Sequence, residues 1–512
     1  MRSGKRKKTG NSIIRAAFVA VSLLLQVGWL LLLVLRLNEY SAVIALFTTV
    51  LTSVAVLRLY TQNTNSAFKM PWIILMMALP VMGFSLYLMV SLFSTPGNTG
   101  KKLRTIRQES KACITQNDAV LETLSREKPD MAGQCRYLWR NTHSPVYDGT
   151  QVAYYPRAAA ALDAMKADLE KAESFIFMEY FIVEDGESFR QIREILVRKA
   201  AEGVDVRLMY DDFGSIGYVN LKFARELNED GIKCRVFNPA IPVLNLFMNN
   251  RDHRKITVID GKVGYTGGYN LADSYFDLTQ PYGDWKDTGV RLEGNAVQSL
   301  TATFLELWGS CSKVREDPAP YLEASCPVEA SGFVQPFGDN PLEDERAAEN
   351  VYINMANQAR DHIYFMTPYL IITDELKHAL GLAAKRGVDV RIITPGVPDK
   401  KTVYALTRSY YAGLAGQGVR IYEYSPGFLH AKQCVCDGVL ASIGTSNLDY
   451  RSLYLHFEND VLLCGCDAVG QMEKDFRETF PLCREVTGQY QRKLSTPLWV
   501  WQCILRLFAP MM

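Results

Sequence analysis

Two short motifs in this chain combine residue types and spacing that fit phosphoryl chemistry. The pattern H-x-K-x4-D occurs at residues 253–260 and again at residues 430–437. Side chains two positions apart on a strand point to the same face, so each copy offers one imidazole and one ammonium group to a common point. An imidazole serves as a nucleophile or as an acid and base, and a lysine donates to phosphate oxygens. The motif residues are His253, Lys255 and Asp260 in the first copy and His430, Lys432 and Asp437 in the second.

Further polar residues follow both motifs. An asparagine lies seventeen residues after each histidine, at Asn270 and Asn447, and closes a segment of small residues. An acid comes later, Asp287 in WKDTGV and Glu458 in HFENDV. We expect the carboxamides to bind phosphoryl oxygens, and the two acids to fix the tautomers of the imidazoles and stabilise their charged forms.

The aspartates that end the motifs have a different expected role. Asp260 and Asp437 lie an odd number of residues from their histidines, so on a strand they point away from the His–Lys face. Although they belong to the catalytic motif, we expect them to form structural salt bridges. Each is followed by glycine, which predicts a turn into a returning strand.

The elements that carry these motifs are themselves repeated. Residues 174–182 and 203–209 are apolar strands flanking a helical stretch, and residues 362–371 and 387–393 repeat this arrangement. A strand–helix–strand unit predicts an α/β fold in which helices cover a sheet. Prolines cluster at residues 316–339, which we interpret as the joint between two copies of one domain.

The N-terminus predicts a membrane anchor. Residues 16–35 form an uncharged apolar run long enough to cross a bilayer, at about 1.5 Å per residue. Two further apolar runs follow at residues 42–57 and 71–93, the second containing Pro80. These additional runs disfavour the alternative of a cleaved signal peptide.

The side of the membrane on which the catalytic portion lies is predicted from the basic residues. Basic clusters lie at residues 5–8 and 101–107, and both prefer the cytoplasmic side of a membrane. That placement needs an even number of spans, whereas three apolar runs are present. We therefore expect a multi-pass protein with a cytoplasmic catalytic portion if the short second run does not cross. Residues 497–512 are rich in tryptophan and leucine and predict either an interfacial tail or a segment docked on the core.

Composition narrows the classes of function. Among 512 residues, Lys plus Arg number 56 and Asp plus Glu 55, so the near-neutral charge disfavours a nucleic-acid binder. The 11 cysteines include no C-x-x-C pair, and no other metal-ligand cluster is visible. No phosphate-binding glycine loop is present either. We therefore expect neither a metal nor a cofactor.

The doubled motif resembles the phospholipase D superfamily. The segments NSAFKMPWIILMMALPVMGFSLYL, WKDTGVRLEG and GTSNLDYRSLYLHFE are similar to bacterial cardiolipin synthases, from about residue 65 to the C-terminus. The resemblance implies two tandem phospholipase D-type α/β sandwich domains packed as a pseudo-dimer, preceded by transmembrane helices. The implied division is a transmembrane anchor at 1–95, a linker at 96–140, domains at 141–316 and 335–490, and a possible interfacial tail at 494–512.

The same resemblance implies phosphatidyl transfer through a phosphohistidine at a bacterial plasma membrane. His253 would attack the phosphorus of one phosphatidylglycerol, and His430 would protonate the leaving glycerol. His430 would then deprotonate a hydroxyl of a second phosphatidylglycerol, which displaces His253 and gives cardiolipin. The assignment of the nucleophile rests on the family, because the repeat is nearly symmetric; one departure is Tyr269, where the second copy has Ser446.

Alternatives remain open at the level of sequence. The same residues would serve a hydrolase that uses water as acceptor, or a transferase that uses another alcohol. A membrane scaffold with an inactive phospholipase fold is disfavoured by the two complete His–Lys–Asn sets. The donor lipid, the acyl preference and the oligomeric state have no signature in the sequence.

Overall fold

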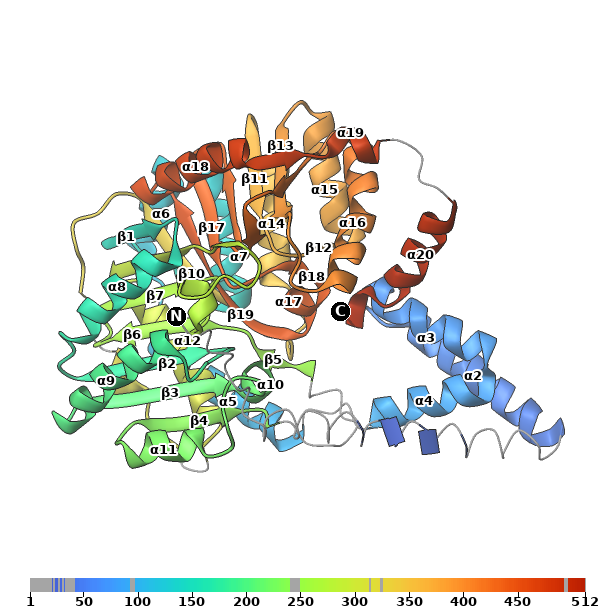
Figure 1. The fold of residues 1–512 in the computed structure, drawn as a ribbon, viewed down its shortest axis with the longest axis horizontal. Helices are drawn as coiled ribbons and strands as arrows, with labels where there is room; N and C mark the ends of the chain where they lie inside the picture. The colour runs from blue at the N-terminus through green and yellow to red at the C-terminus, as the bar shows by residue number, and fades with distance from the viewer. Residues whose placement is uncertain are drawn as a thin grey trace, which may run out of the picture.

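Two sheets that lie side by side, with helices on their outer faces, make up most of the molecule (Figure 1). The chain enters from a group of N-terminal helices on one side of both sheets. The computed structural model describes residues 42–92, 97–239, 249–312, 315–322, 326–491 and 496–511, and isolated residues between 21 and 32.

The first sheet has seven strands and is built by the first half of the chain. Its core strands are apolar and almost wholly buried, as expected for a sheet covered by helices. In sheet order the strands are β1 (Thr150–Tyr155), β9 (Gly289–Gly294), β7 (Val263–Gly267), β6 (Lys255–Ile259), β2 (Phe175–Tyr180), β3 (Asp205–Asp211) and β4 (Lys233–Phe237). The helices of this half are α8 (Ala158–Leu169), α9 (Glu187–Ala201), α10 (Asp212–Ser215), α11 (Phe223–Glu229), α12 (Val297–Ser310), α13 (Ala319–Leu322) and the short η2 (Asp273–Phe276).

The second sheet repeats the same order, with β10 in the place of β1, and adds β20 at one edge and a pairing of β5 with β19. Strands β19, β17, β16, β11, β13 and β14 correspond in order to β9, β7, β6, β2, β3 and β4. In sheet order the strands are β10 (Phe333–Asp339), β19 (His456–Cys464), β17 (Leu440–Gly444), β16 (Gln433–Cys436), β11 (His362–Met366), β13 (Asp389–Pro395), β14 (Arg420–Tyr424) and β20 (Cys483–Glu485). The helices are α14 (Ala347–Gln358), α15 (Asp374–Lys385), α16 (Lys401–Ala415), α17 (Tyr450–Tyr454), α18 (Asp467–Thr479), α19 (Thr487–Tyr490) and the short η3 (Phe480–Leu482).

The predicted strand–helix–strand units are present in both halves. Strands β2 and β3 are parallel neighbours joined through α9, and β11 and β13 are parallel neighbours joined through α15. Each of these helices is followed by a glycine with positive φ, +97° at Gly203 and +98° at Gly387. A left-handed residue just beyond a helix is the usual way to end it and redirect the chain.

Short strand pairs join the two halves. Strand β5 (Arg251–Asp252) of the first half runs parallel to β19 of the second, and β15 (Gly427–Leu429) of the second half runs parallel to β8 (Asp284–Lys286) of the first. One hydrophobic core draws on both halves, so the sheets form a single body around a shared interior. Its buried members include Val290 and Leu292 from the first half and Val435, Ile443 and Val461 from the second.

The stretch expected to be a linker is helical and packs against this body. It forms α5 (Gly97–Cys113), α6 (Asp118–Glu127) and α7 (Pro129–Thr142). Their apolar faces enter the cores, with Leu103, Leu124 and Leu138 all buried. The signal that could have predicted these helices is the amphipathic spacing of apolar residues in this polar segment, not its mean hydropathy.

The N-terminal apolar runs differ from the expectation of three spans. Most of the run at 16–35 lies outside the described residues, and the run at 42–57 lies within α2 (Ala42–Thr61). The run at 71–93 is not one helix: α3 (Ser66–Ala78) ends before Pro80, where α4 (Pro80–Leu92) begins. Proline removes a backbone donor and clashes with the preceding turn, which explains the break. Across the described residues, no helix combines the length and the apolar character that crossing a membrane requires.

The C-terminal segment docks one face on the protein and exposes the other. Helix α20 (Thr496–Leu507), followed by η4 (Ala509–Met511), lies against α3 and α16. Leu505 is buried there, and Arg506 Nε donates to Ser409 Oγ at 3.1 Å. Trp501 and Phe508 remain about half exposed, at 51% and 49%. The alternative of a segment docked on the core is therefore confirmed for one face, and contact of the exposed face with a membrane stays a prediction.

Candidate active site

The two motif histidines directly follow β5 and β15, the short strands that pair across the junction of the halves. His253 lies between β5 and β6, and its backbone N–H donates to Phe457 O at 2.9 Å. His430 lies between β15 and β16, and its N–H donates to Lys286 O at 2.8 Å. Each histidine is therefore held by a strand of the opposite half. Both side chains are largely buried, with exposed fractions of 7% and 6%.

The predicted acids contact the imidazoles, but they do so across the two halves. His253 Nδ1 lies 2.9 Å from Glu458 Oε2 of the second half. His430 Nδ1 lies 2.6 Å from Asp287 Oδ2 of the first half. Both carboxylates are fully buried. The sequence predicted the pairing of acid and imidazole but contained no sign of this exchange, because each acid follows the histidine of its own copy along the chain.

Both lysines stay beside their histidines. Lys255 Nζ donates to the carbonyl of His253 at 2.6 Å, and Lys432 Nζ lies 2.8 Å and 3.0 Å from the two ring nitrogens of His430. Lys255 and Lys432 are each only 1% exposed. Burial lowers the pKa of Lys255 to about 8 and that of Lys432 to about 7, although the charges of Glu458 and Asp287 oppose this.

The charged groups of both halves shift one another's pKa values. Burial lowers the pKa of His253 well below its usual value, and the charges of Lys255, Lys432 and His430 add to that effect. Burial raises the pKa of Asp287 to about 7, with Lys432 opposing it. A site rich in cations and closed to bulk water favours a bound anion such as a phosphodiester.

The two asparagines are buried near this centre with different partners. Asn270 Oδ1 accepts the backbone N–H of Ile182 at 3.0 Å, and its Nδ2 donates to Tyr275 Oη at 2.9 Å. The Tyr275 ring stands edge-on to His430, with centroids 5.2 Å apart. Asn447 is 5% exposed. Their expected role in phosphate binding stays a prediction.

Asp260 and Asp437 anchor backbone rather than form the expected salt bridges. Asp260 accepts the N–H groups of Glu173, Ser174 and Phe175 at 2.7–2.9 Å. Asp437 does the same for residues 360–362, and these bonds lower its pKa against the effect of burial. Both aspartates have positive φ, +53° and +51°, at the turn into the returning strand. Asp tolerates that conformation better than most residues, so the motif aspartate fixes the turn and the start of the neighbouring strand.

Replacing either turn aspartate by alanine is expected to affect stability more than chemistry. Loss of an acceptor for three N–H groups should lower the free energy of unfolding by about 1–3 kcal/mol for Asp260→Ala and for Asp437→Ala. The Asp→Asn variants keep one acceptor oxygen and should be affected less. Thermal unfolding, measured beside the activity of the folded fraction, tests this. Full stability with lost activity in either alanine variant would contradict it.

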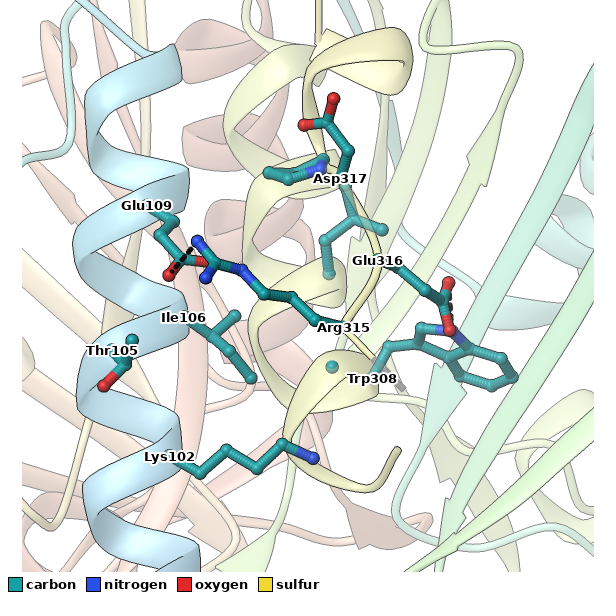
Figure 2. Close-up of a pocket in the computed structure, with 11 residues that line it drawn as sticks. Lys102, Thr105, Ile106, Glu109, Trp308, Arg315, Glu316 and Asp317 are labelled. Atoms are coloured by element: carbon teal, nitrogen blue, oxygen red, sulfur yellow. Dashed lines mark hydrogen bonds and ion pairs between the residues drawn. The ribbon is translucent and has the colours of Figure 1, made fainter. Parts of the chain in front are cut away.

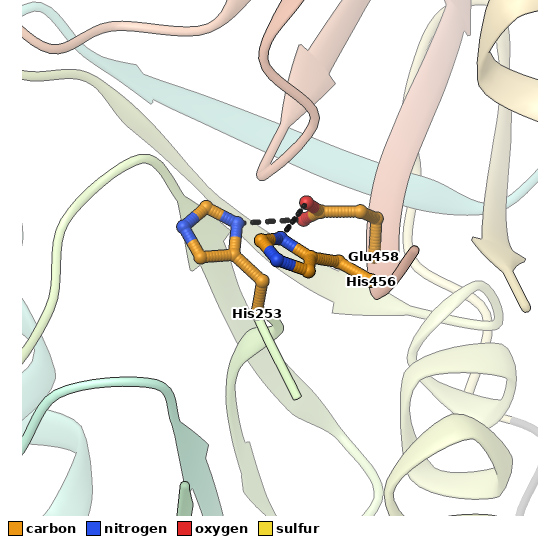
Figure 3. Close-up of side chains that lie close together, drawn as sticks. All are labelled: His253, His456 and Glu458. Atoms are coloured by element: carbon orange, nitrogen blue, oxygen red, sulfur yellow. Dashed lines mark hydrogen bonds and ion pairs between the residues drawn. The ribbon is translucent and has the colours of Figure 1, made fainter. Parts of the chain in front are cut away.

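A third histidine, which the motif did not include, belongs to the same cluster. Among the residues that the structure describes, His253, His456 and Glu458 form the one group whose possible metal-ligand atoms all lie within 4.8 Å of one another (Figure 3). The charges of Lys255 and Arg451 act on this group, and like charges disfavour a divalent cation there. We therefore assign no metal to it. His456 could have been found by aligning HFE with WKD in the repeat.

A surface pocket elsewhere does not take part in this centre. It lies between α5 and the chain that leaves α12, and Figure 2 shows Arg315 reaching across it to Glu109. That ion pair spans 2.6 Å, and Arg235 binds Glu316 at 2.7 Å beside it. None of the motif residues lines this pocket.

Comparison with known sequences decides the family. The profile described as "Cardiolipin synthase, PLD-like domain" matches residues 165–308 and 352–480, which contain both motifs. The chain belongs to this family. Among similar relatives, the chain is 33% identical to cardiolipin synthase 2 of Bacillus cereus, over 89% of this chain and 88% of that protein. It is 41% identical to an uncharacterized protein of Streptococcus mutans, over 90% of this chain and 99% of that protein.

A solved structure supports the fold of this member of the PLD-like cardiolipin synthase family. The phosphatidylserine synthase of Haemophilus influenzae superposes with a TM-score of 0.55 and 14% sequence identity, covering 74% of this chain and 97% of that chain. At that identity the likeness concerns the mixed α/β fold alone. The family match confirms the expected membership of the phospholipase D superfamily, which agrees with the pairing of two His–Lys sets at one interface.

Proposed function

We propose that this protein is a cardiolipin synthase, a phosphatidyltransferase that converts two phosphatidylglycerol molecules into cardiolipin and glycerol. The observation that carries the proposal is the junction of the halves, where two imidazoles are each held at Nδ1 by a buried carboxylate. Hydrogen-bonded in this way, an imidazole presents Nε2 either as a nucleophile or as an acid and base. Membership of the PLD-like cardiolipin synthase family supports the choice of lipid.

In the first half-reaction His253 is the nucleophile. Its Nε2 forms a bond to the phosphorus of the donor, and the bond from phosphorus to the glycerol oxygen breaks. His430 gives a proton to that oxygen, so glycerol leaves uncharged. The positive charge that the phosphorylated ring acquires is balanced by Glu458, which lies on its Nδ1. Asp287 stabilises the protonated form of His430 in the same way.

The second half-reaction reverses these roles. His430, now neutral, takes a proton from a hydroxyl of the second phosphatidylglycerol. The resulting oxygen attacks the phosphorus, and the bond to His253 Nε2 breaks. Lys255 and Lys432 would neutralise the phosphoryl oxygens in both steps, with Asn270 and Asn447 as further donors. One phosphodiester replaces another, so no nucleotide is required.

We further propose that the enzyme works at a bacterial membrane. The apolar run at 16–35 and the exposed apolar side chains Leu46, Phe47 and Leu57 of α2 support membrane contact. The exposed Trp501 on α20 adds to this apolar surface. A catalytic portion on the cytoplasmic side is our reading of the basic clusters.

The test is a product analysis. Purified full-length protein is placed in mixed micelles with phosphatidylglycerol as the only phospholipid, and products are identified by mass spectrometry. Cardiolipin with an equal amount of glycerol is the expected result. Phosphatidic acid in place of cardiolipin would overturn the proposal in favour of a hydrolase. Cardiolipin formed only after phosphatidylethanolamine is added would revise the donor lipid.

The buried lysines predict how activity depends on pH. The value of kcat/KM reports groups of the free enzyme, in which Lys432 and Lys255 have pKa values of about 7 and 8. As pH rises through that range the ammonium groups lose their protons, so kcat/KM should fall. Lys432→Arg, whose guanidinium stays charged, should move the basic limb to higher pH even though its activity is lower. A basic limb that stays in place in both Lys432→Arg and Lys255→Arg would contradict this.

A further inference from the structure

The two imidazoles have different neighbours at equivalent positions. Trp285 and His456 each lie two residues before the carboxylate that binds the opposite histidine. Trp285 is 5.7 Å from His430 between ring centroids, and His456 is 5.3 Å from His253. Trp285 lies on β8 and His456 begins β19, and each of these strands pairs with a short strand of the other half. The repeat therefore places an indole beside one imidazole and a second imidazole beside the other.

The contacts of His456 fix its tautomer. Arg451 Nε donates to His456 Nε2 at 3.3 Å, so that nitrogen is an acceptor and the ring proton lies on Nδ1. His456 Nδ1 in turn lies 3.6 Å from Glu458 Oε1 (Figure 3). Within the described part of the chain, neither of these two buried atoms has a hydrogen-bond partner. The neutral N–H of His456 thus faces Oε1 of the carboxylate that holds His253, and the Ser452 hydroxyl also acts on that carboxylate as a donor.

The other oxygen of this carboxylate is already used. Glu458 Oε2 accepts from Thr445 Oγ1 at 2.5 Å and contacts His253 Nδ1 at 2.9 Å. The charged groups that act on the pair come from several elements. They are Lys255 of β6, Arg251 of β5, Lys432 just before β16, Arg451 of α17 and Asp460 of β19.

The protonation state of Glu458 decides whether His253 can react. Burial raises the pKa of Glu458 well above its usual value, and the charge of Lys255 opposes this. A protonated Glu458 would donate to His253 Nδ1 and leave the ring proton on Nε2, where it blocks attack on phosphorus. An ionised Glu458 accepts the Nδ1 proton and leaves the Nε2 lone pair free.

We propose that His456 is a positioning residue, with its tautomer set by Arg451, that keeps Glu458 ionised and turned toward His253. The inference rests on the proposed function only in that His253 is the nucleophile. It gives a physical reason for unequal roles in a nearly symmetric repeat. The imidazole with the polar neighbour stays neutral and nucleophilic, and the imidazole beside Trp285 exchanges protons.

The experiment compares His456→Asn with His456→Phe in the full-length protein. Loss of the N–H group that faces the charged carboxylate at 3.6 Å should raise the pKa of Glu458 by up to about one unit. The acidic limb of kcat/KM in His456→Phe should therefore move up by up to about one pH unit, which is at most about a tenfold loss on that limb and little loss on the plateau. His456→Asn, whose amide can donate to Oε1, should restore much of the limb.

Two outcomes would overturn the inference. One is an equal loss at every pH in both variants, which a merely structural role would give. The other is a covalent phosphatidyl adduct found on the peptide of His430 instead of that of His253. Either result leaves the proposed function standing if the wild type makes cardiolipin. A wild type that makes phosphatidic acid overturns the proposed function, and the pH profile of that product still tests His456.

Discussion

His253→Ala is expected to lower cardiolipin formation by about 10⁴-fold or more, because it removes the atom that forms the covalent bond to phosphorus. The neighbouring nitrogen groups are engaged elsewhere and do not replace it: His456 Nε2 accepts from Arg451, and Lys255 donates to the carbonyl of residue 253. The rate is measured with radiolabelled phosphatidylglycerol in mixed micelles.

The matched control for this variant is His378→Ala. His378 is an exposed histidine of α15, a helix of the second half that carries none of the motif residues. It should keep wild-type activity and melting temperature. His253→Ala should also keep the melting temperature within a few degrees, because the substitution removes a single imidazole ring from a polar site and leaves the hydrophobic cores intact. Substantial cardiolipin formation by a folded His253→Ala protein would contradict the assignment of the nucleophile.

A direct trapping experiment supports the same point. Wild-type enzyme mixed with labelled lipid and quenched in alkali, which preserves a phosphohistidine, should carry label on the peptide that contains residue 253. The His430→Ala variant should also carry label on this peptide when the labelled lipid has a leaving group that departs without a proton. His253→Ala should carry none. The three results together separate the nucleophile from the acid and base.

The sequence predicted those parts of the molecule in which local pattern decides structure. The strand–helix–strand units followed from apolar runs and from the glycines at 203 and 387, and the turn at Asp260-Gly261 followed from its dipeptide. Parity also predicted that Asp260 points away from His253. The spacing could not show that its partners are backbone N–H groups, because these lie at and just before the start of β2, 85 residues or more away in the sequence.

What the sequence did not predict depends on how the halves meet. Glu458 follows His430 in the chain but binds His253, and only the parallel pairing of β5 with β19 brings them together. His456 escaped notice for the same reason, since its neighbour lies in the other half. Mean hydropathy marked residues 71–93 as one span, yet the break before Pro80 divides it. Tertiary contacts decide the first two features, and the local effect of a proline decides the third.

Exchange of the carboxylates between the halves predicts that Glu458→Gln and Asp287→Asn fail at different steps. Each variant removes a negative charge that stabilises a cationic imidazole, which costs about 10³–10⁴-fold with phosphatidylglycerol, by analogy with the loss of such a charge in hydrolytic triads. Glu458→Gln weakens attack by His253. Asp287→Asn weakens proton transfer by His430. With the natural lipid the two variants therefore look alike.

A donor with a p-nitrophenyl leaving group separates them, because nitrophenolate departs without a proton. Asp287→Asn should release about one equivalent of nitrophenolate per enzyme in a burst at nearly the wild-type rate, and then stall, since the acceptor hydroxyl still needs His430 as a base. Glu458→Gln should show no burst. Stopped-flow absorbance measures both. If the carboxylates served the histidines of their own halves, the results would be exchanged: Asp287→Asn would lose the burst and Glu458→Gln would keep it. Only the arrangement in which Glu458 holds His253 and Asp287 holds His430 predicts a burst from a variant of the first half and none from a variant of the second.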